Sequence, residues 1–241
     1  HIIPGLSAFV GGDITAGILA SGMLEQEAYT LLIDLGTNGE MALGNRHRLH
    51  ACATAAGPAF EGGVNRGIWG ADMVRLLQKL LEEGLMDGQG LLKEPYFTKG
   101  VRIGDVLVTK ESVRAVQLAK GAIAAGIEIL ADSYGIRFSD ISKVVLAGGF
   151  GYYLDPKAAV AIGLLPEELA DCTVTGGNTA LSGAAMVGSR ILTAGGKQTA
   201  EGTLPDGGDD LRKRQELQIR ILNLAEEEKF PETFLTKINF N

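Results

Sequence analysis

The chain has 241 residues, of which 46% are hydrophobic, so one large domain or two small ones can bury a stable core without disulfides or structural metals. A net charge of −7 with no basic run disfavours non-specific nucleic-acid binding, and no apolar run reaches the about 18–20 residues of a membrane helix. The two cysteines are too few for an iron–sulfur cluster or a structural zinc, and their scarcity indicates a reducing compartment, so we expect a cytoplasmic protein.

The first part of the chain predicts one helix and then three antiparallel strands. Residues 13–22 read as a helix that follows the loop PGLSAFVGG. Residues 30–34 form a strand that is apolar on both faces, and 40–43 and 48–54 follow as two more strands. The Asn38-Gly39 pair between the first two strands is a strong hairpin signal, and its plain structural interpretation is a type I′ turn.

The middle of the chain alternates helices and strands. A glycine-rich loop leads into a helix at 72–83, which is followed by short strand-like pieces within 97–108 and by a long amphipathic helix at 110–134. The remaining elements are a buried strand at 143–147, a short helix at 157–162, a strand at 172–175 and a helix at 179–192. The order β-β-β-α-insert-α-β-α-β-α predicts an α/β fold of the ribonuclease-H-like type, with a mixed sheet flanked by helices.

The C-terminal part differs in composition from the rest. Residues 194–210 are polar and rich in glycine, which predicts a mobile loop or insertion after a main unit that spans 1–193. Residues 211–228 read as a charged amphipathic helix, and 229–241 read as a tail. We therefore expect 211–241 to form a C-terminal helical extension that packs on the main unit.

The hairpin is the first candidate for chemistry. A tip that carries Gly36, Thr37, Asn38 and Gly39 can aim backbone N–H groups and side-chain donors at phosphate oxygens. The carboxylate of Asp34, just before the tip, can hold Mg²⁺ through water. A hairpin that binds nothing is about equally compatible with this motif.

Two other turns follow buried strands and are weaker signals. The strand KVVLA ends in Gly148 and Gly149, where the missing Cβ atoms would let a flat ligand approach, or where the chain merely turns. Asn178 lies at a helix N-terminus after the next strand, where it either helps to bind an anion or caps the helix.

Further candidates lie on both sides of the hairpin. Asp13, after Gly12, could act as a general base near a phosphate or could be a helix cap. The loop after the third strand is rich in small residues that can lie against a ligand, and it offers one charged group, Glu61, although it can also be a helix-entry turn. Candidates in this loop region are Thr54, Gly57 and Glu61. Lys120, on the long helix, could contact adenine or ribose, although most helix lysines are simply solvated.

The order of these motifs carries more information than any one of them. The segment LLIDLGTNGE resembles the second phosphate loop of the actin/sugar-kinase/heat-shock-chaperone ATPases, and KVVLAGGFGYYL resembles their adenosine loop. This resemblance implies that Gly148, Gly149, Phe150 and Lys120 line an adenosine site. The segment FVGGD resembles that of sugar kinases, in which an aspartate after glycines is the catalytic base, and this places Asp13 in that role.

A closer resemblance extends over residues 4–190. It rests on the segments FVGGDITAGIL, LLIDLGTNGEMALG, ACATAAGPAFEGG, VQLAKGAIAAGIEIL and VLAGGFGYYLDP, which together are similar to the ATP-dependent reductive activators of corrinoid proteins. The resemblance implies ATP and Mg²⁺ as ligands and an upstream plant-type 2Fe–2S domain as electron donor. It also implies a corrinoid protein or methyltransferase as partner, whose Co(II) is reduced to Co(I), and it leaves a homodimer open.

The chain departs from this family pattern in two ways. It lacks the ferredoxin cysteines and the first phosphate loop, both of which lie upstream in such proteins, and it starts at His1 in an apolar stretch. We therefore expect a fragment of a longer protein that is inactive when isolated. Two other functions stay open at this stage: a lobe of a sugar or small-metabolite kinase, and a degenerate lobe that serves only as a docking module.

Overall fold

A six-stranded mixed sheet forms the centre of the computed structural model, which describes residues 2–57, 59, 70–193, 211, 214 and 216–241. The strand order is β7-β6-β1-β2-β3-β8. Strands β1 to β3 form an antiparallel meander, β6 and β7 continue it in parallel beside β1, and β8 pairs in parallel with β3. The strands are β1 Tyr29–Leu35, β2 Gly39–Gly44, β3 Arg48–Thr54, β6 Ile141–Ala147, β7 Thr173–Gly177 and β8 Gln218–Leu222.

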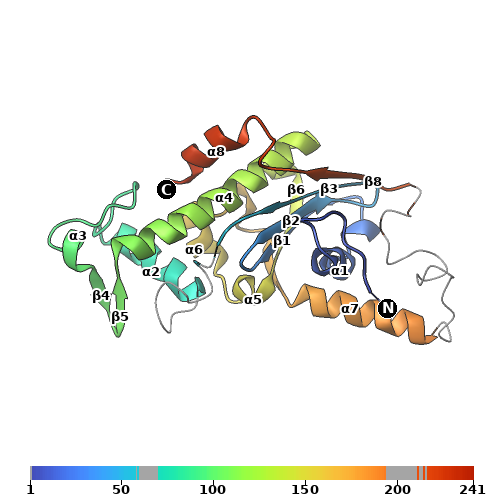
Figure 1. Cartoon of the computed structure of the whole chain (residues 1–241), viewed down its shortest axis with the longest axis horizontal. Coiled ribbons are helices and arrows are strands. Elements are labelled where there is room, and N and C mark those ends of the chain that lie inside the picture. The colour runs from blue at the N-terminus through green and yellow to red at the C-terminus, as the bar shows by residue number, and fades with distance from the viewer. Residues whose placement is uncertain (1, 58, 60–69, 194–210, 212–213, 215) are drawn as a thin grey trace.

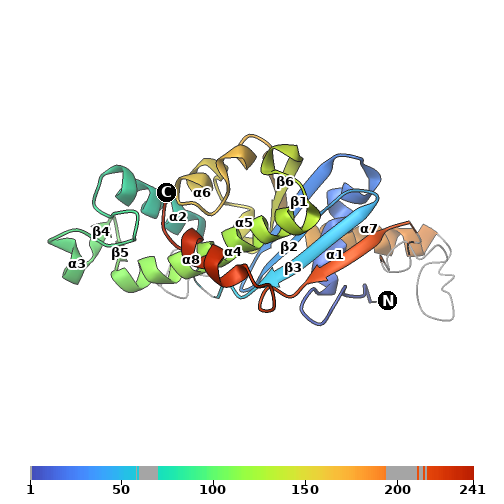
Figure 2. The same cartoon turned by 90° about the horizontal axis from the view of Figure 1, so that it is seen from above.

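Helices cover both faces of this sheet (Figures 1 and 2). One face packs against α2 Gly70–Glu82, α4 Lys110–Tyr134, α5 Gly148–Gly151 and α6 Pro156–Ala161, and the other against α1 Gly12–Ser21 and α7 Thr179–Thr193. Along β1 the side chains alternate between the layers, because successive residues of a strand point to opposite faces. Leu31 and Ile33 belong to the core on the α4 side, whereas Leu32 belongs to the core on the α1 side.

Smaller elements complete the fold. A two-stranded ribbon and a short helix precede α4, which begins at a capping box between Thr109 and Ser112 and ends at Gly135. These and the other elements that lie wholly within the described residues are α3 Tyr96–Lys99, β4 Val101–Ile103, β5 Val106–Val108, α8 Phe230–Lys237 and short 3₁₀ turns at Met23–Glu25, Phe138–Asp140 and Glu167–Leu169. In the part of the chain with described coordinates, no helix combines the length and apolarity needed to cross a bilayer.

The predicted α/β architecture with a mixed sheet flanked by helices is confirmed, and the long helix has the predicted bounds. The predicted helix over 211–228 is wrong, because Gln218–Leu222 is the edge strand β8 and the only helix of the C-terminal part with described coordinates is α8. Exposure alternates along β8, with Gln218 and Arg220 exposed and the residues beside them more buried. That is the period of a strand with one face toward solvent. The predicted loop at 194–210 lies outside the described residues.

The C-terminal tail is tied to α4 by Lys120. This side chain is 1% exposed, its Nζ donates a hydrogen bond to the carbonyl oxygen of Asn239, and the ammonium lies 5.2 Å from the ring centroid of Phe240. The Phe240 N–H donates to the carbonyl oxygen of Gly88 at 2.7 Å. The ammonium of Lys120 thus contacts the chain's own tail, and a contact between Lys120 and adenosine stays a prediction.

Burial of Lys120 predicts a distinct pH dependence of stability. Burial, followed by the charge of Lys237, lowers the pKa of Lys120 from 10.5 to about 7. Between these values the unfolded chain binds the proton more tightly than the folded one, so the free energy of unfolding rises with pH by up to about 1 kcal/mol per unit. We expect Lys120→Met to remove this rise. The free energy of unfolding of both proteins is measured by urea unfolding at several pH values from 7 to 9. An equal dependence on pH in the wild type and in Lys120→Met would contradict the prediction.

Candidate functional site

Three carboxylates from three elements meet where β1 ends. Asp34 on β1 and Glu40 on β2 are direct cross-strand partners, so their side chains share the face of the sheet that packs against α1. Asp13 lies in the first turn of α1, close enough to Glu40 for its charge to act on that carboxyl group. Glu40 Oε1 also accepts a hydrogen bond from the Gly11 N–H at 3.1 Å, which fastens the loop before α1 to the hairpin.

The crowding of these groups makes them hard to ionise together. Burial, reinforced by the charge of Asp13, raises the pKa of Asp34 to about 6. For Glu40, burial is again the largest cause, and the charges of Asp13 and Asp34 add to it, so its pKa rises to about 7 although the hydrogen bond from Gly11 opposes the change. Like charges that face each other in this way favour any cation that can approach them.

Glu40 is the residue of this site that sequence reasoning missed. The signal was present, because a hairpin that pairs residue 35 with 39 must also pair 34 with 40. The pairing of residues across the hairpin, unlike the motif alone, predicts that the carboxylates of Asp34 and Glu40 lie on one face of the sheet.

A three-residue loop of Gly36, Thr37 and Asn38 forms the hairpin tip. The Gly36 N–H donates to the carbonyl oxygen of Asn38 at 3.1 Å, and the Gly57 N–H donates to that of Thr37 at 2.9 Å, so the loop after β3 braces the tip. The type I′ interpretation is wrong, because such a turn needs positive φ at its central residues. Among the described residues no non-glycine has positive φ, and Gly39 pairs within β2.

The turn after β6 lies against the same site. Gly148 has a φ of +85°, and a Cβ atom there would meet Asp34 Oδ1 and stand 2.5 Å from the carbonyl oxygen of Leu35. A Cβ on Gly149 would meet nothing within 4 Å, so this residue leaves open space beside the site. The Phe150 ring is buried in the core. If this residue lines an adenosine site, as predicted, it does so with its backbone rather than with its ring.

The other predicted residues have local roles. Asn178 Oδ1 accepts a hydrogen bond from the Leu181 N–H at 2.8 Å, which is the helix-cap alternative. A Cβ on Gly12 would strike the carbonyl oxygen of Ile3, so this glycine serves the packing of its own loop. Thr54 is buried at the end of β3, close to the hairpin. Glu61 lies outside the described residues.

The carboxylates suit a hydrated cation better than a bare one. No group of three or more His, Cys, Asp or Glu side chains within the described ranges is arranged to hold a metal directly. Mg²⁺ usually keeps several waters and takes only one or two carboxylates beside phosphate oxygens. Asp34, whose pKa is raised by burial and by the charge of Asp13, is a fitting partner for such an ion.

Glu40→Gln is expected to stabilise the protein at pH 8 and not at pH 5. Because the pKa of Glu40 is raised from 4.5 to about 7 in the folded state, its ionisation costs stability as the pH rises through this window. Glutamine can still accept the bond from Gly11 but carries no charge. Allowing for screening by solvent, we expect the free energy of unfolding of Glu40→Gln at pH 8 to exceed that of the wild type by about 1 kcal/mol, or about 2–4 °C in Tm. An equal gain at pH 5 in thermal melts would refute the role of charge.

A three-strand meander continued by parallel strands, with carboxylates and a glycine turn where β1 and β6 end, defines one lobe of an actin-like ATPase fold. A family model described as the C-terminal domain of RACo, the ASKHA domain, matches residues 28–66 and 64–193. The chain belongs to this family.

Named relatives agree with the family. The chain is 34% identical over 222 residues to the corrinoid activation enzyme RamQ of Eubacterium limosum, covering 68% of this chain and 37% of RamQ. It is 26% identical over 229 residues to the Co(II) methylated amine-specific corrinoid protein reductase of Methanosarcina barkeri, covering 74% of this chain and 42% of the reductase.

A solved structure gives the same result. The structure of a reductive activator for corrinoid, iron-sulfur protein superposes with a TM-score of 0.80 at 26% identity, over 99% of this chain and 44% of the activator. The chain thus spans less than half the length of each of these three proteins.

Proposed function

We propose that this chain is the part of a longer reductive activator that binds and hydrolyses ATP, so that Co(I) is restored in a corrinoid-dependent methyltransferase system. The observation that carries this proposal is the gathering of Asp13, Asp34 and Glu40 beside the hairpin tip and the Gly148-Gly149 turn. The relatives named as activators of corrinoid proteins supply the reaction class. The electron would come from an upstream 2Fe–2S domain.

The hairpin would hold the phosphates. The tip formed by Gly36, Thr37, Asn38 and Gly39 carries short polar side chains and backbone N–H groups next to the carboxylate of Asp34, although the Gly36 N–H is already bonded within the tip. Asp34 would hold Mg²⁺ through water, and that ion would supply positive charge to the phosphate oxygens. Gly149 leaves room for the adenosine beside the same strand end.

Asp13 would orient the water that attacks the terminal phosphate. Asp13 Oδ1 accepts a hydrogen bond from the Ile14 N–H at 2.9 Å, which fixes the side chain at the start of α1, near Glu40. A carboxylate fixed in this way can receive a proton from water, and phosphoryl transfer depends mostly on such positioning and electrostatics.

ATP would act on the corrinoid protein by changing the relative stability of two arrangements of the longer protein. A nucleotide can do so only if it binds the two arrangements with different affinity. Release of a cobalt ligand in one arrangement would raise the reduction potential of Co(II) and so make it accessible to the electron donor.

Product analysis tests the nucleotide chemistry. The full-length protein is incubated with Mg·ATP and the Co(II) corrinoid protein, and nucleotide and phosphate are followed by chromatography. We expect ADP and inorganic phosphate, formed faster when the corrinoid protein is present. Phosphate transferred to a sugar or small hydroxyl compound would instead identify a kinase, and unchanged ATP would identify a docking module.

A further inference from the structure

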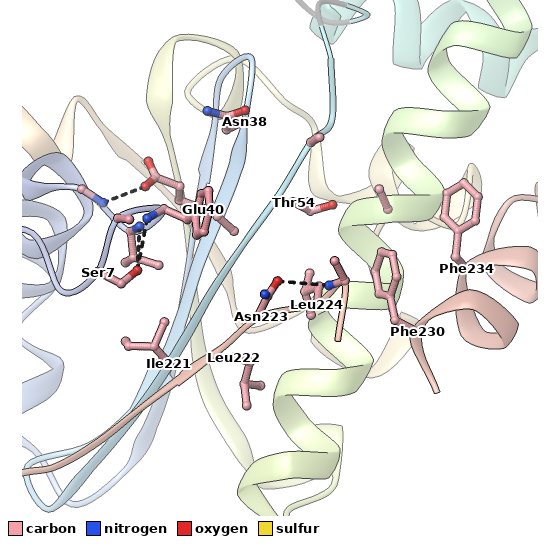
Figure 3. A pocket seen from close by; sticks show the side chains of 18 of the residues that line it. Ser7, Asn38, Glu40, Thr54, Ile221, Leu222, Asn223, Leu224, Phe230 and Phe234 are labelled. Atoms are coloured by element: carbon pink, nitrogen blue, oxygen red, sulfur yellow. Dashed lines mark hydrogen bonds between the residues drawn. The ribbon is translucent and has the colours of Figure 1, made fainter. Parts of the chain in front are cut away.

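A groove of about 1100 Å³ runs from the carboxylates to the C-terminal helix (Figure 3). One wall is the loop at 7–11 before α1, and the other is formed by α4 and α8. The ends of β3 and β8 form the floor between them. The groove therefore joins the proposed catalytic site to the C-terminal part of the chain, to which no motif had assigned a function.

The two ends of the groove differ in chemistry. Asp13, Asn38 and Glu40 line one end, and they include the only charged side chains among its described lining residues. The far end is apolar and aromatic, and its main residues are Leu118, Leu222, Leu224, Phe230 and Phe234. The rings of Phe230 and Phe234 are stacked with their centroids 6.1 Å apart. The groove thus combines negative charge with an apolar surface and contributes no cation of its own.

Part of the apolar surface is exposed to solvent. Phe9 is 74% exposed and Leu118 is 42% exposed, on opposite walls. Two internal hydrogen bonds order the loop that carries Phe9. The Leu6 N–H donates to the carbonyl oxygen of Val10 at 2.8 Å, and the Phe9 N–H donates to Ser7 Oγ at 3.2 Å. Apolar surface that is exposed on an ordered loop beside a groove is characteristic of an interaction site.

We propose that this groove docks the corrinoid protein through a segment in which a lysine or arginine is flanked by apolar side chains. The apolar groups would fill the space between Phe9 and the phenylalanines of α8, and the cation would face Asp13 and Glu40. This inference rests on the proposed function for the identity of the partner. Its chemistry follows from charge complementarity, because the described lining residues include two acids and no bases, and such a lining favours a cationic occupant.

The size and the exposed walls of the groove favour a segment of a protein over a small molecule. Sites for small ligands typically enclose about 300–1,000 Å³ and bury most of the ligand. This groove, at about 1100 Å³, is at the upper end of that range, and its walls carry exposed apolar side chains such as Phe9 and Leu118. An apolar helix face or loop in such a groove is a common mode of peptide recognition. Docking there would couple to nucleotide binding, because both involve the same carboxylates and coupling between two sites is reciprocal.

Two substitutions at one exposed position test this proposal. Leu118→Lys and Leu118→Glu change the same groove-lining side chain to opposite charges, and its exposure lets either variant fold. Leu192→Lys, at an 80% exposed position near the end of α7, is the matched control. Binding of the purified Co(II) corrinoid protein to each full-length variant is measured by thermophoresis at about 0.05 M and about 0.5 M salt.

We expect Leu118→Lys to weaken binding about tenfold or more at low salt, and clearly more than Leu118→Glu. This difference between the two variants should shrink at high salt, while Leu192→Lys binds like the wild type. Unchanged binding by Leu118→Lys, or equal losses in both Leu118 variants, would overturn the proposal. So would a loss of ATP affinity in Leu118→Lys, which would place the nucleotide at the apolar end of the groove.

The result also separates this proposal from the function on which it rests. If the wild-type protein forms Co(I) with ATP while Leu118→Lys binds and activates the corrinoid protein normally, only the docking site is wrong. If the wild-type protein neither binds a corrinoid protein nor forms Co(I), the proposed function fails together with it.

Discussion

Asp13→Asn in the full-length protein is expected to lower ATP turnover at least about 100-fold, which is the usual contribution of a positioned general base. Asparagine keeps the size of the side chain and its first-turn position on α1, but it cannot receive a proton from water. The hydrogen bond from the Gly11 N–H to Glu40 does not involve Asp13, so the loop at 7–11 should stay in place. Steady-state phosphate release measures the effect.

The affinity for ATP provides the control. Because Asp13 would act on the water rather than on the nucleotide, we expect the Kd for Mg·ATP to change by less than about threefold. Unchanged turnover in Asp13→Asn would refute the assignment of this residue. A large loss of affinity with unchanged turnover at saturation would make Asp13 part of the binding site instead.

Gly148→Ala is expected to be the most destabilising single substitution near the site. The residue has a φ of +85°, which side chains rarely adopt, and the new Cβ would stand 2.5 Å from the carbonyl oxygen and 2.9 Å from the nitrogen of Leu35. Both obstacles are backbone atoms of the central strand, which cannot move aside cheaply. We expect a loss of about 2–3 kcal/mol, or about 5–10 °C in Tm.

Gly149→Ala is the matched control for this substitution. A Cβ at this position meets nothing within 4 Å, so the Tm should change by less than about 2 °C. If adenosine lies against this glycine, the added methyl group should nevertheless weaken ATP binding. A variant that melts like the wild type and binds ATP like the wild type would remove Gly149 from the site.

Much of the fold was predictable because its elements carry local signals. The strand over 30–34 and the strand before Gly148 contain uninterrupted apolar runs at 31–33 and 144–147, and α4 has both a long amphipathic period and a terminal glycine. The Asp34 hairpin was recognisable from its composition. The type of turn could not be predicted in the same way. The pair Asn38-Gly39 is typical of a two-residue loop, whereas the hairpin has a loop of three residues, 36–38.

The rest depended on contacts between distant segments. The segment over 218–222 alternates apolar and polar residues, yet it becomes a strand only because β3 offers it a free edge to pair with. Lys120 lies on the amphipathic helix like an ordinary solvated lysine, and it is buried through contacts with distant segments such as the tail at 238–241. Glu40 gains its role from a cross-strand partner and from the Gly11 N–H, 29 residues away.

The most direct test of the account is the appearance of Co(I) in a reaction that contains the full-length protein, the Co(II) corrinoid protein and a low-potential electron donor. Absorbance of Co(I) is followed with and without Mg·ATP, for the wild type and for Asp13→Asn. The account predicts Co(I) only with the wild type and ATP. Equal formation of Co(I) without ATP, or by Asp13→Asn at the wild-type rate, would contradict the claim that ATP hydrolysis at this site drives the activation.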